Sequence, residues 1–151
     1  MRDIVLECNP DEALVRTLGY SKREITHQPN KGQVFNYLEK NHQACGIVDE
    51  DPGSANPGYF SHYIKQGETK FDVDFFLNIG TGAKLIVLKP RLEDWVLKQA
   101  KQEGVEPDEF SLPPNGRQLH RIVNQRIPKF EQMLHQMKGC AALNYLKHLL
   151  K

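Results

Sequence analysis

The chain has 151 residues, a length that suits one domain and leaves little room for a second. Hydrophobic residues make up 39% and charged residues 26%, which excludes a fibrous or a disordered chain. Lys and Arg number 20 against 19 Asp and Glu, a net charge of +1, so the simplest argument for nucleic-acid binding, a strongly basic chain, does not apply.

The charge is unevenly distributed along the sequence. Residues 1–75 carry eight basic and twelve acidic residues, whereas residues 76–151 carry twelve and seven. From Pro113 to the end there are seven basic residues and one acid, Glu131. An acidic first half and a basic second half favour a cation site beside a polyanion-binding surface, with ordinary surface variation as the alternative.

Cys8, Cys45 and Cys140 are widely spaced and form no zinc-binding pattern. Their odd number and the lack of a signal-peptide pattern favour a reduced, cytoplasmic compartment. The longest apolar stretches are far shorter than a membrane span, so we expect no membrane partner.

Two kinds of pattern alternate along the first two-thirds of the chain. Short apolar runs predict buried parallel strands, and apolar residues at helical spacing predict the helices that connect them. The predicted strands are residues 3–8, 24–27, 44–49 and 84–88, and the predicted helices are residues 9–18, 30–41 and 90–103. Residues 51–58 read as a loop and 59–66 as a short helix, while residues 67–83 fit neither pattern.

The last third of the chain predicts helices alone, over residues 115–126, 128–138 and 140–151. Alternation of strand and helix before them predicts a small parallel, Rossmann-like α/β sheet of about four strands flanked by helices. We expect a single domain over residues 1–151, with a core in residues 1–104 and a helical C-terminal extension in residues 113–151.

Acidic residues follow two of the predicted strands. Glu7 ends the first strand, and Asp49 and Asp51 end the third. Functional residues of open α/β sheets lie at the carboxyl ends of the strands. In an extended chain Asp49 and Asp51 point to one side, and they meet Glu7 if the first and third strands are neighbours.

Converging carboxylates repel one another unless a cation lies between them. Mg²⁺ binds through one or two carboxylates together with water and phosphate oxygens, and such an ion supports phosphoryl transfer. Asp51 stands before Pro52 and Gly53, so a cap of a turn is the alternative role for this residue.

This layout, a Glu after the first strand and a DxD motif after the third, resembles the Toprim domain. That fold is shared by topoisomerases, bacterial primases, small maturation nucleases and nucleases of the overcoming-lysogeny-defect type. The resemblance covers about residues 1–104 and includes a Leu-Glu-Asp stretch at residues 92–94, as in small stand-alone Toprim-like proteins.

The resemblance implies that Glu7 is the catalytic acid or base and that Asp49 and Asp51 bind Mg²⁺ or Mn²⁺. The sequence departs from the family where a Gly often follows the Glu, because Cys8 stands there.

Two arginines of the last third lie on one predicted helix face. Arg117, His120, Arg121 and Asn124 recur at helical spacing, and we predict that Arg117 and Arg121 contact nucleic-acid phosphates. A face that is only solvated is the alternative. Glu93 and Asp94 are expected to complement the dipole of the helix that they begin.

These observations predict a metal-dependent nuclease or phosphotransferase that acts on nucleic acid. The alternative is a non-catalytic module that binds a protein partner or a second copy through the C-terminal helices, and a phospho-accepting Asp domain ranks last. Acids that converge around open space favour catalysis, whereas a Lys or Arg paired into that space favours the module.

Overall fold

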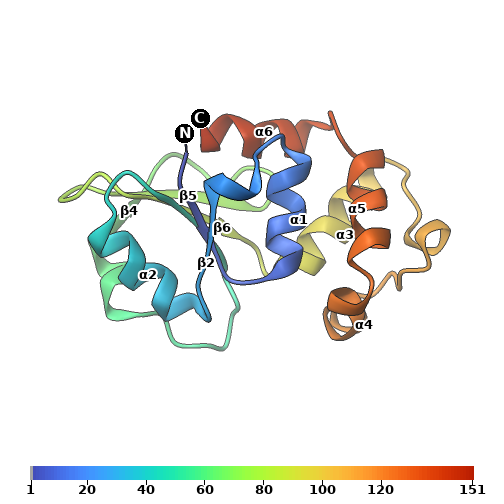
Figure 1. The fold of residues 1–151 in the computed structure, drawn as a ribbon, viewed down its shortest axis with the longest axis horizontal. Coiled ribbons are helices and arrows are strands. Elements are labelled where there is room, and N and C mark those ends of the chain that lie inside the picture. The colour runs from blue at the N-terminus through green and yellow to red at the C-terminus, as the bar shows by residue number, and fades with distance from the viewer. Residues whose placement is uncertain (1) are drawn as a thin grey trace.

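The structure, a computed structural model, describes residues 2–151 and has an α/β fold (Figure 1). Its single described sheet has six strands in the order β2-β1-β3-β6-β5-β4. The strands are β1 Ile4–Leu6, β2 Ile25–His27, β3 Cys45–Asp49, β4 Tyr63–Lys65, β5 Val73–Asn78 and β6 Lys84–Leu88. β2, β1, β3 and β6 run parallel, and β5 and β4 add an antiparallel edge.

The predicted α/β class is therefore confirmed, but a purely parallel sheet of about four strands is not. The short helix predicted for residues 59–66 is wrong, because a 3₁₀ turn at Gly58–His62 leads directly into β4. β5 was hidden in the ambiguous stretch since Phe75 packs on one hydrophobic cluster and Phe76 on the other. The buried polar side chains of Asp74 and Asn78 interrupt the continuous apolar run of a strand covered on both faces, and Phe76 next to Phe75 interrupts the two-residue period of a half-buried strand.

The helices lie where the sequence pattern predicts them, with shifts at the ends. They are α1 Asn9–Thr17, α2 Lys31–Lys40, α3 Leu92–Gln102, α4 Gly116–Ile122, α5 Ile127–Gln136 and α6 Ala141–Leu150. Cys8 occupies the N-cap position of α1 without a capping hydrogen bond from its side chain, and Pro10 is the second residue of the helix. Asn30 caps α2 by accepting a hydrogen bond from the backbone N–H of Gln33 at 2.9 Å.

Alternate residues of the parallel strands serve two hydrophobic clusters, one on each face of the sheet. The larger cluster joins α1, α3, α5 and α6 to one face through Ile4, Leu6, Ile47, Ile86 and Leu88. The smaller cluster joins α2 to the other face through Val5, Val48, Leu85 and Val87. Figure 1 shows α2 on the left of the molecule and α1, α3 and α5 grouped on the right.

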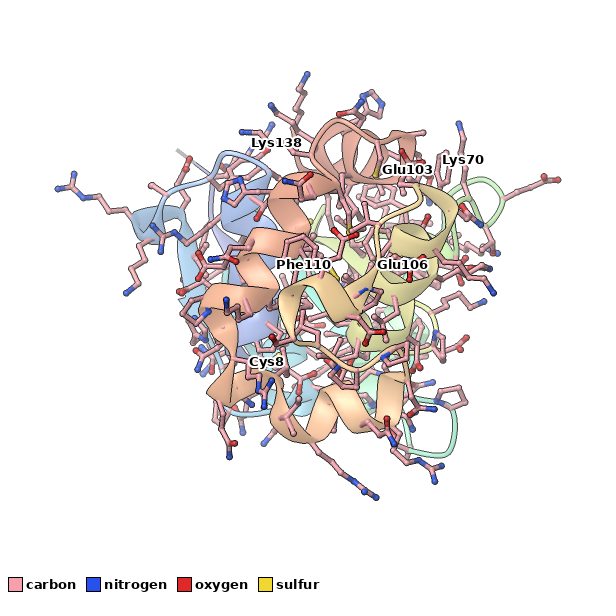
Figure 2. All side chains as sticks on the ribbon, turned by 90° about the vertical axis from the view of Figure 1, so that its right-hand side faces the viewer. Cys8, Lys70, Glu103, Glu106, Phe110 and Lys138 are labelled. Atoms are coloured by element: carbon pink, nitrogen blue, oxygen red, sulfur yellow. The ribbon has the colours of Figure 1, made fainter. Side chains whose placement is uncertain are left out.

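The C-terminal helices are part of the larger cluster. α5 contributes Phe130, Met133 and Leu134, and α6 contributes Leu143, Leu146 and Leu150, all of them buried. Figure 2 looks at the end of the molecule where α5 and the segment that carries Glu103, Glu106 and Phe110 lie across the core. Residues 113–151 therefore complete the core that β1 and α1 begin.

None of the helices in residues 2–151 is both long and apolar enough to cross a membrane. The cysteines are free thiols, with Cys45 and Cys140 buried and Cys8 half-buried.

Candidate functional site

The acids that follow β1 and β3 face one open cleft. β1 and β3 are adjacent, with Ile4 paired to Cys45, so the ends of both strands lie side by side. Glu7, Asp49 and Asp51 all line this cleft, which has a volume of about 1110 Å³. Figure 1 shows the chain segments that follow β1 and β3 at the lower edge of the molecule, where α4 also lies.

Asp49, the last residue of β3, is partly buried in the wall of the cleft. Its Oδ1 accepts a hydrogen bond from the backbone N–H of Leu92 at 3.0 Å, so it also caps the start of α3. Burial, followed by the nearby carboxyl groups of Asp11, Glu93 and Glu7, raises the pKa of Asp49 to about 8. A carboxyl group in these surroundings favours either a bound proton or a bound cation.

Asp51 is placed differently from the expectation. Its φ of 48° takes the chain out of the extended region, so the two-residue alternation that was to align it with Asp49 ends here. The Oδ1 atom of Asp51 lies 3.1 Å from Nη2 and 3.2 Å from Nε of Arg91. Both side chains are substantially exposed, so the pair is open to solvent and to a competing ligand.

Glu7, directly after β1, and Lys31, the first residue of α2, both line the cleft. Burial raises the pKa of Glu7, the charge of Lys31 opposes that rise, and Asp51 adds to it. Lys31 donates from Nζ to the backbone oxygen of Glu50 at 3.1 Å and to Oδ1 of Asn56 at 3.2 Å. The same lysine thus holds the loop after β3 and brings a positive charge among the acids.

Asp11 is a member of the acidic group that the sequence did not single out. It is 5% exposed, and Cys8 donates from Sγ to its Oδ2 at 3.1 Å. Burial raises the pKa of Asp11 to about 7 together with the charges of Glu7 and Glu93, while the hydrogen bond from Cys8 opposes the rise. No local pattern distinguishes Asp11, because the helix dipole alone favours an acid in the first turn of α1.

Glu93 and His120 form a second pair that the sequence did not assign to the site. Glu93 is 3% exposed in the first turn of α3, and its Oε1 lies 2.7 Å from Nδ1 of His120 in α4. His120 lines the cleft. The helix-dipole role expected for Glu93 does not account for its burial beside Asp49 and Asp11.

The two arginines predicted to contact phosphates are separated by the structure. Arg117, in the first turn of α4, lines the cleft together with Asn115 and Gly116. Arg121 is exposed one turn later and is not part of the cleft lining. The basic side chains that face the acids are therefore Lys31, Arg91 and Arg117.

The donor atoms present suit a hard cation that keeps part of its water. Within residues 2–151 no three or more His, Cys, Asp or Glu side chains form a ready metal cage. The free acceptors at the cleft are carboxylate oxygens, and Mg²⁺ is commonly held by one or two of these plus substrate phosphates. The residues thus fit an ion that is completed by substrate, and they do not fit a closed structural site.

Comparisons with models of known families, with curated proteins and with solved structures found no match to this chain.

Proposed function

We propose that this protein cleaves or transfers phosphodiesters of nucleic acid with the help of Mg²⁺ or Mn²⁺. The observation that carries the proposal is the shared cleft: Glu7, Asp49 and Asp51 line it together with Lys31, Arg91 and Arg117. The acidic side chains that line the cleft attract a divalent cation, and the basic side chains that line it attract the phosphates of a polyanion.

Each residue has a role in this proposal. Asp49 and Asp51 hold the ion, which supplies Lewis-acid stabilisation of the charge that develops on the phosphate. Glu7, whose pKa is raised by burial, takes a proton from the attacking hydroxyl or water. Lys31 and Arg117 orient the phosphate by charge-assisted hydrogen bonds.

The Arg91–Asp51 ion pair supports a second candidate, a non-catalytic module. An arginine held 3.1 Å from a proposed ligand occupies space that a cation needs. In this alternative the acids cap turns and helices, as Asp49 does for α3, and the chain acts by binding a protein partner. The exposure of the pair and the open cleft favour the catalytic proposal, because an entering cation displaces a solvated ion pair at low cost.

Calorimetric titration with Mg²⁺ and Mn²⁺ tests the proposal, alone and with a short DNA or RNA present. The variants are Asp49→Asn, which still accepts the hydrogen bond from Leu92, and Asp51→Asn. We expect each to lose the binding or weaken it by about tenfold or more. Asp108→Asn, an exposed acid in the 3₁₀ turn Pro107–Phe110, is the matched control and should bind as the native chain does.

The same samples are then assayed for cleavage of single- and double-stranded DNA and RNA, with Glu7→Gln as the inactive reference. If the native chain binds no ion at millimolar concentration, with or without nucleic acid, the catalytic proposal fails and the module remains.

A further inference from the structure

The Glu93–His120 pair couples a buried carboxylate to an exposed imidazole. The Glu93 side chain is 4% exposed and the His120 side chain 67% exposed, with 2.7 Å between Oε1 and Nδ1. Glu93 lies in the first turn of α3 and does not line the cleft. His120, in α4, does line it. Glu93 therefore has two routes to the cleft, a direct contact with the imidazole of His120 and the effect of its charge on Asp49.

The contact fixes which ring nitrogen is available. An ionised Glu93 only accepts hydrogen bonds, and Nδ1 of His120 then carries the proton that it donates to Glu93. Nε2 has no hydrogen-bond partner within the described residues and is left for the solvent-filled cleft. In the doubly protonated ring the second proton lies on Nε2.

The pair formed by His27 and Glu12 serves as a comparison for the burial and location of the Glu93–His120 pair. His27 Nε2 and Glu12 Oε1 are 3.0 Å apart, but their side chains are 40% and 18% exposed and neither lines the cleft. That pair is an ordinary surface contact. The Glu93–His120 pair differs from it by the burial of its acid and by its place on the wall that carries Arg117.

We propose that His120 is the general acid of phosphodiester cleavage at this cleft and that Glu93 is its positioning residue. The inference rests on the proposed function above. In the step, a water oxygen forms a bond to phosphorus while the bond from phosphorus to the leaving oxygen breaks. The proton of the water goes to Glu7, and Nε2 of His120 gives its proton to the leaving oxygen, so a neutral imidazole remains hydrogen-bonded to Glu93.

Comparing two substrates of the full chain separates this role from a structural one. One is an oligonucleotide, whose leaving alkoxide needs a proton; the other is the p-nitrophenyl ester of thymidine 5′-monophosphate, whose weakly basic p-nitrophenolate does not. We expect His120→Gln to lower kcat on the oligonucleotide by about 10²–10⁴-fold with little change in KM, and to affect the ester far less. Glu93→Gln should show the same substrate dependence, more weakly, because its amide oxygen still accepts the Nδ1 proton without the charge.

His27→Gln is the matched control, since it breaks a His–Glu pair that lies outside the cleft, and it should leave both reactions unchanged. Thermal unfolding checks that the variants fold, and His120→Asn replaces His120→Gln if the latter does not. Equal losses on both substrates, or no loss on the oligonucleotide, overturn the role of His120 while the proposed function stands. Absence of metal-dependent cleavage of either substrate by the native chain overturns both.

Discussion

Burial of carboxyl groups at the cleft is the feature with the clearest consequence at the scale of single residues. Asp11 is fully enclosed by α1 and its neighbours, and the thiol of Cys8 is its hydrogen-bond partner. An ionised carboxylate in this position has lost its water without gaining a cation. The folded chain therefore resists the loss of this proton, and stability depends on pH.

The direction follows from proton linkage. Asp11 titrates near 3.8 when exposed and near 7 in the folded chain. Between these values the folded state binds more protons than the unfolded state, so the free energy of unfolding decreases as the pH rises from about 4 to 7. One such group contributes a slope of at most about 1.4 kcal/mol per pH unit.

We expect Asp11→Asn to make this decrease shallower and to raise the free energy of unfolding at pH 8 relative to the native chain. Urea denaturation from pH 5 to 8 in the presence of a chelator measures this pH dependence of the free energy of unfolding. Asp108→Asn, which changes an exposed acid, should keep the native slope. An unchanged slope in Asp11→Asn would show that its carboxyl group is ionised throughout.

At the scale of elements, the contact between α3 and α4 decides whether the second half of the chain reaches the cleft. Gly116, the first residue of α4, lies so close to Asp94 that a Cβ atom there would stand 1.9 Å from Oδ1 and 3.3 Å from the Cα atom. Only glycine lets the helix approach this closely. The same approach brings Arg117 and His120 to the cleft.

Gly116→Ala is expected to lower the free energy of unfolding by about 1–3 kcal/mol, because either Asp94 or the helix must move. It should also weaken binding of nucleic acid, since Arg117 moves with the helix. Gly58→Ala is the control, because a Cβ atom at Gly58 meets nothing within 4 Å. Urea denaturation and a fluorescence binding titration supply the two readings, and equal stability of the two variants would contradict the close seating of α4.

At the scale of the whole molecule, the C-terminal helices and the sheet share one core. Phe130 of α5 is completely buried in the cluster that also contains Ile4 of β1 and Leu14 of α1. The helices α1 and α5 are in direct contact. Residues 113–151 therefore stabilise the sheet as well as carrying basic side chains.

Phe130→Ala should cost about 3–5 kcal/mol of unfolding free energy, as expected for a phenylalanine removed from a packed core. We expect the sheet and the helices to unfold together in a single transition, whose midpoint moves to a lower urea concentration. Circular dichroism and the fluorescence of Trp95, in the same cluster, follow the two parts. Lys129→Ala, an exposed neighbour, should have little effect, and a separate early transition of the helices would contradict the shared core.

The sequence was sufficient to predict those elements whose local pattern fits only one kind of secondary structure. Continuous apolar runs marked β1, β3 and β6, because strands covered on both faces need apolar side chains on both. The position of Glu7 and Asp49 at strand ends followed from the same runs, and so did their meeting, once β1 and β3 were taken as neighbours. Asp51 and β5 were harder to predict. A positive φ at Asp51 ends the expected alternation, and β5 has neither a regular alternation nor an unbroken apolar run, because Asp74 is buried within it.

Only the tertiary structure decided which other residues lie close to the acids that line the cleft. Asp11 and Glu93 looked like ordinary first-turn acids, and their burial depends on β1, β3 and α4 coming together. His120 and Arg117 are more than a hundred residues from Glu7 in the chain, so no local pattern ties them to it. The sequence alone determined the strand ends and their acids, which depend on neighbouring residues, whereas the fold determined burial, pKa and partners, which depend on distances through space.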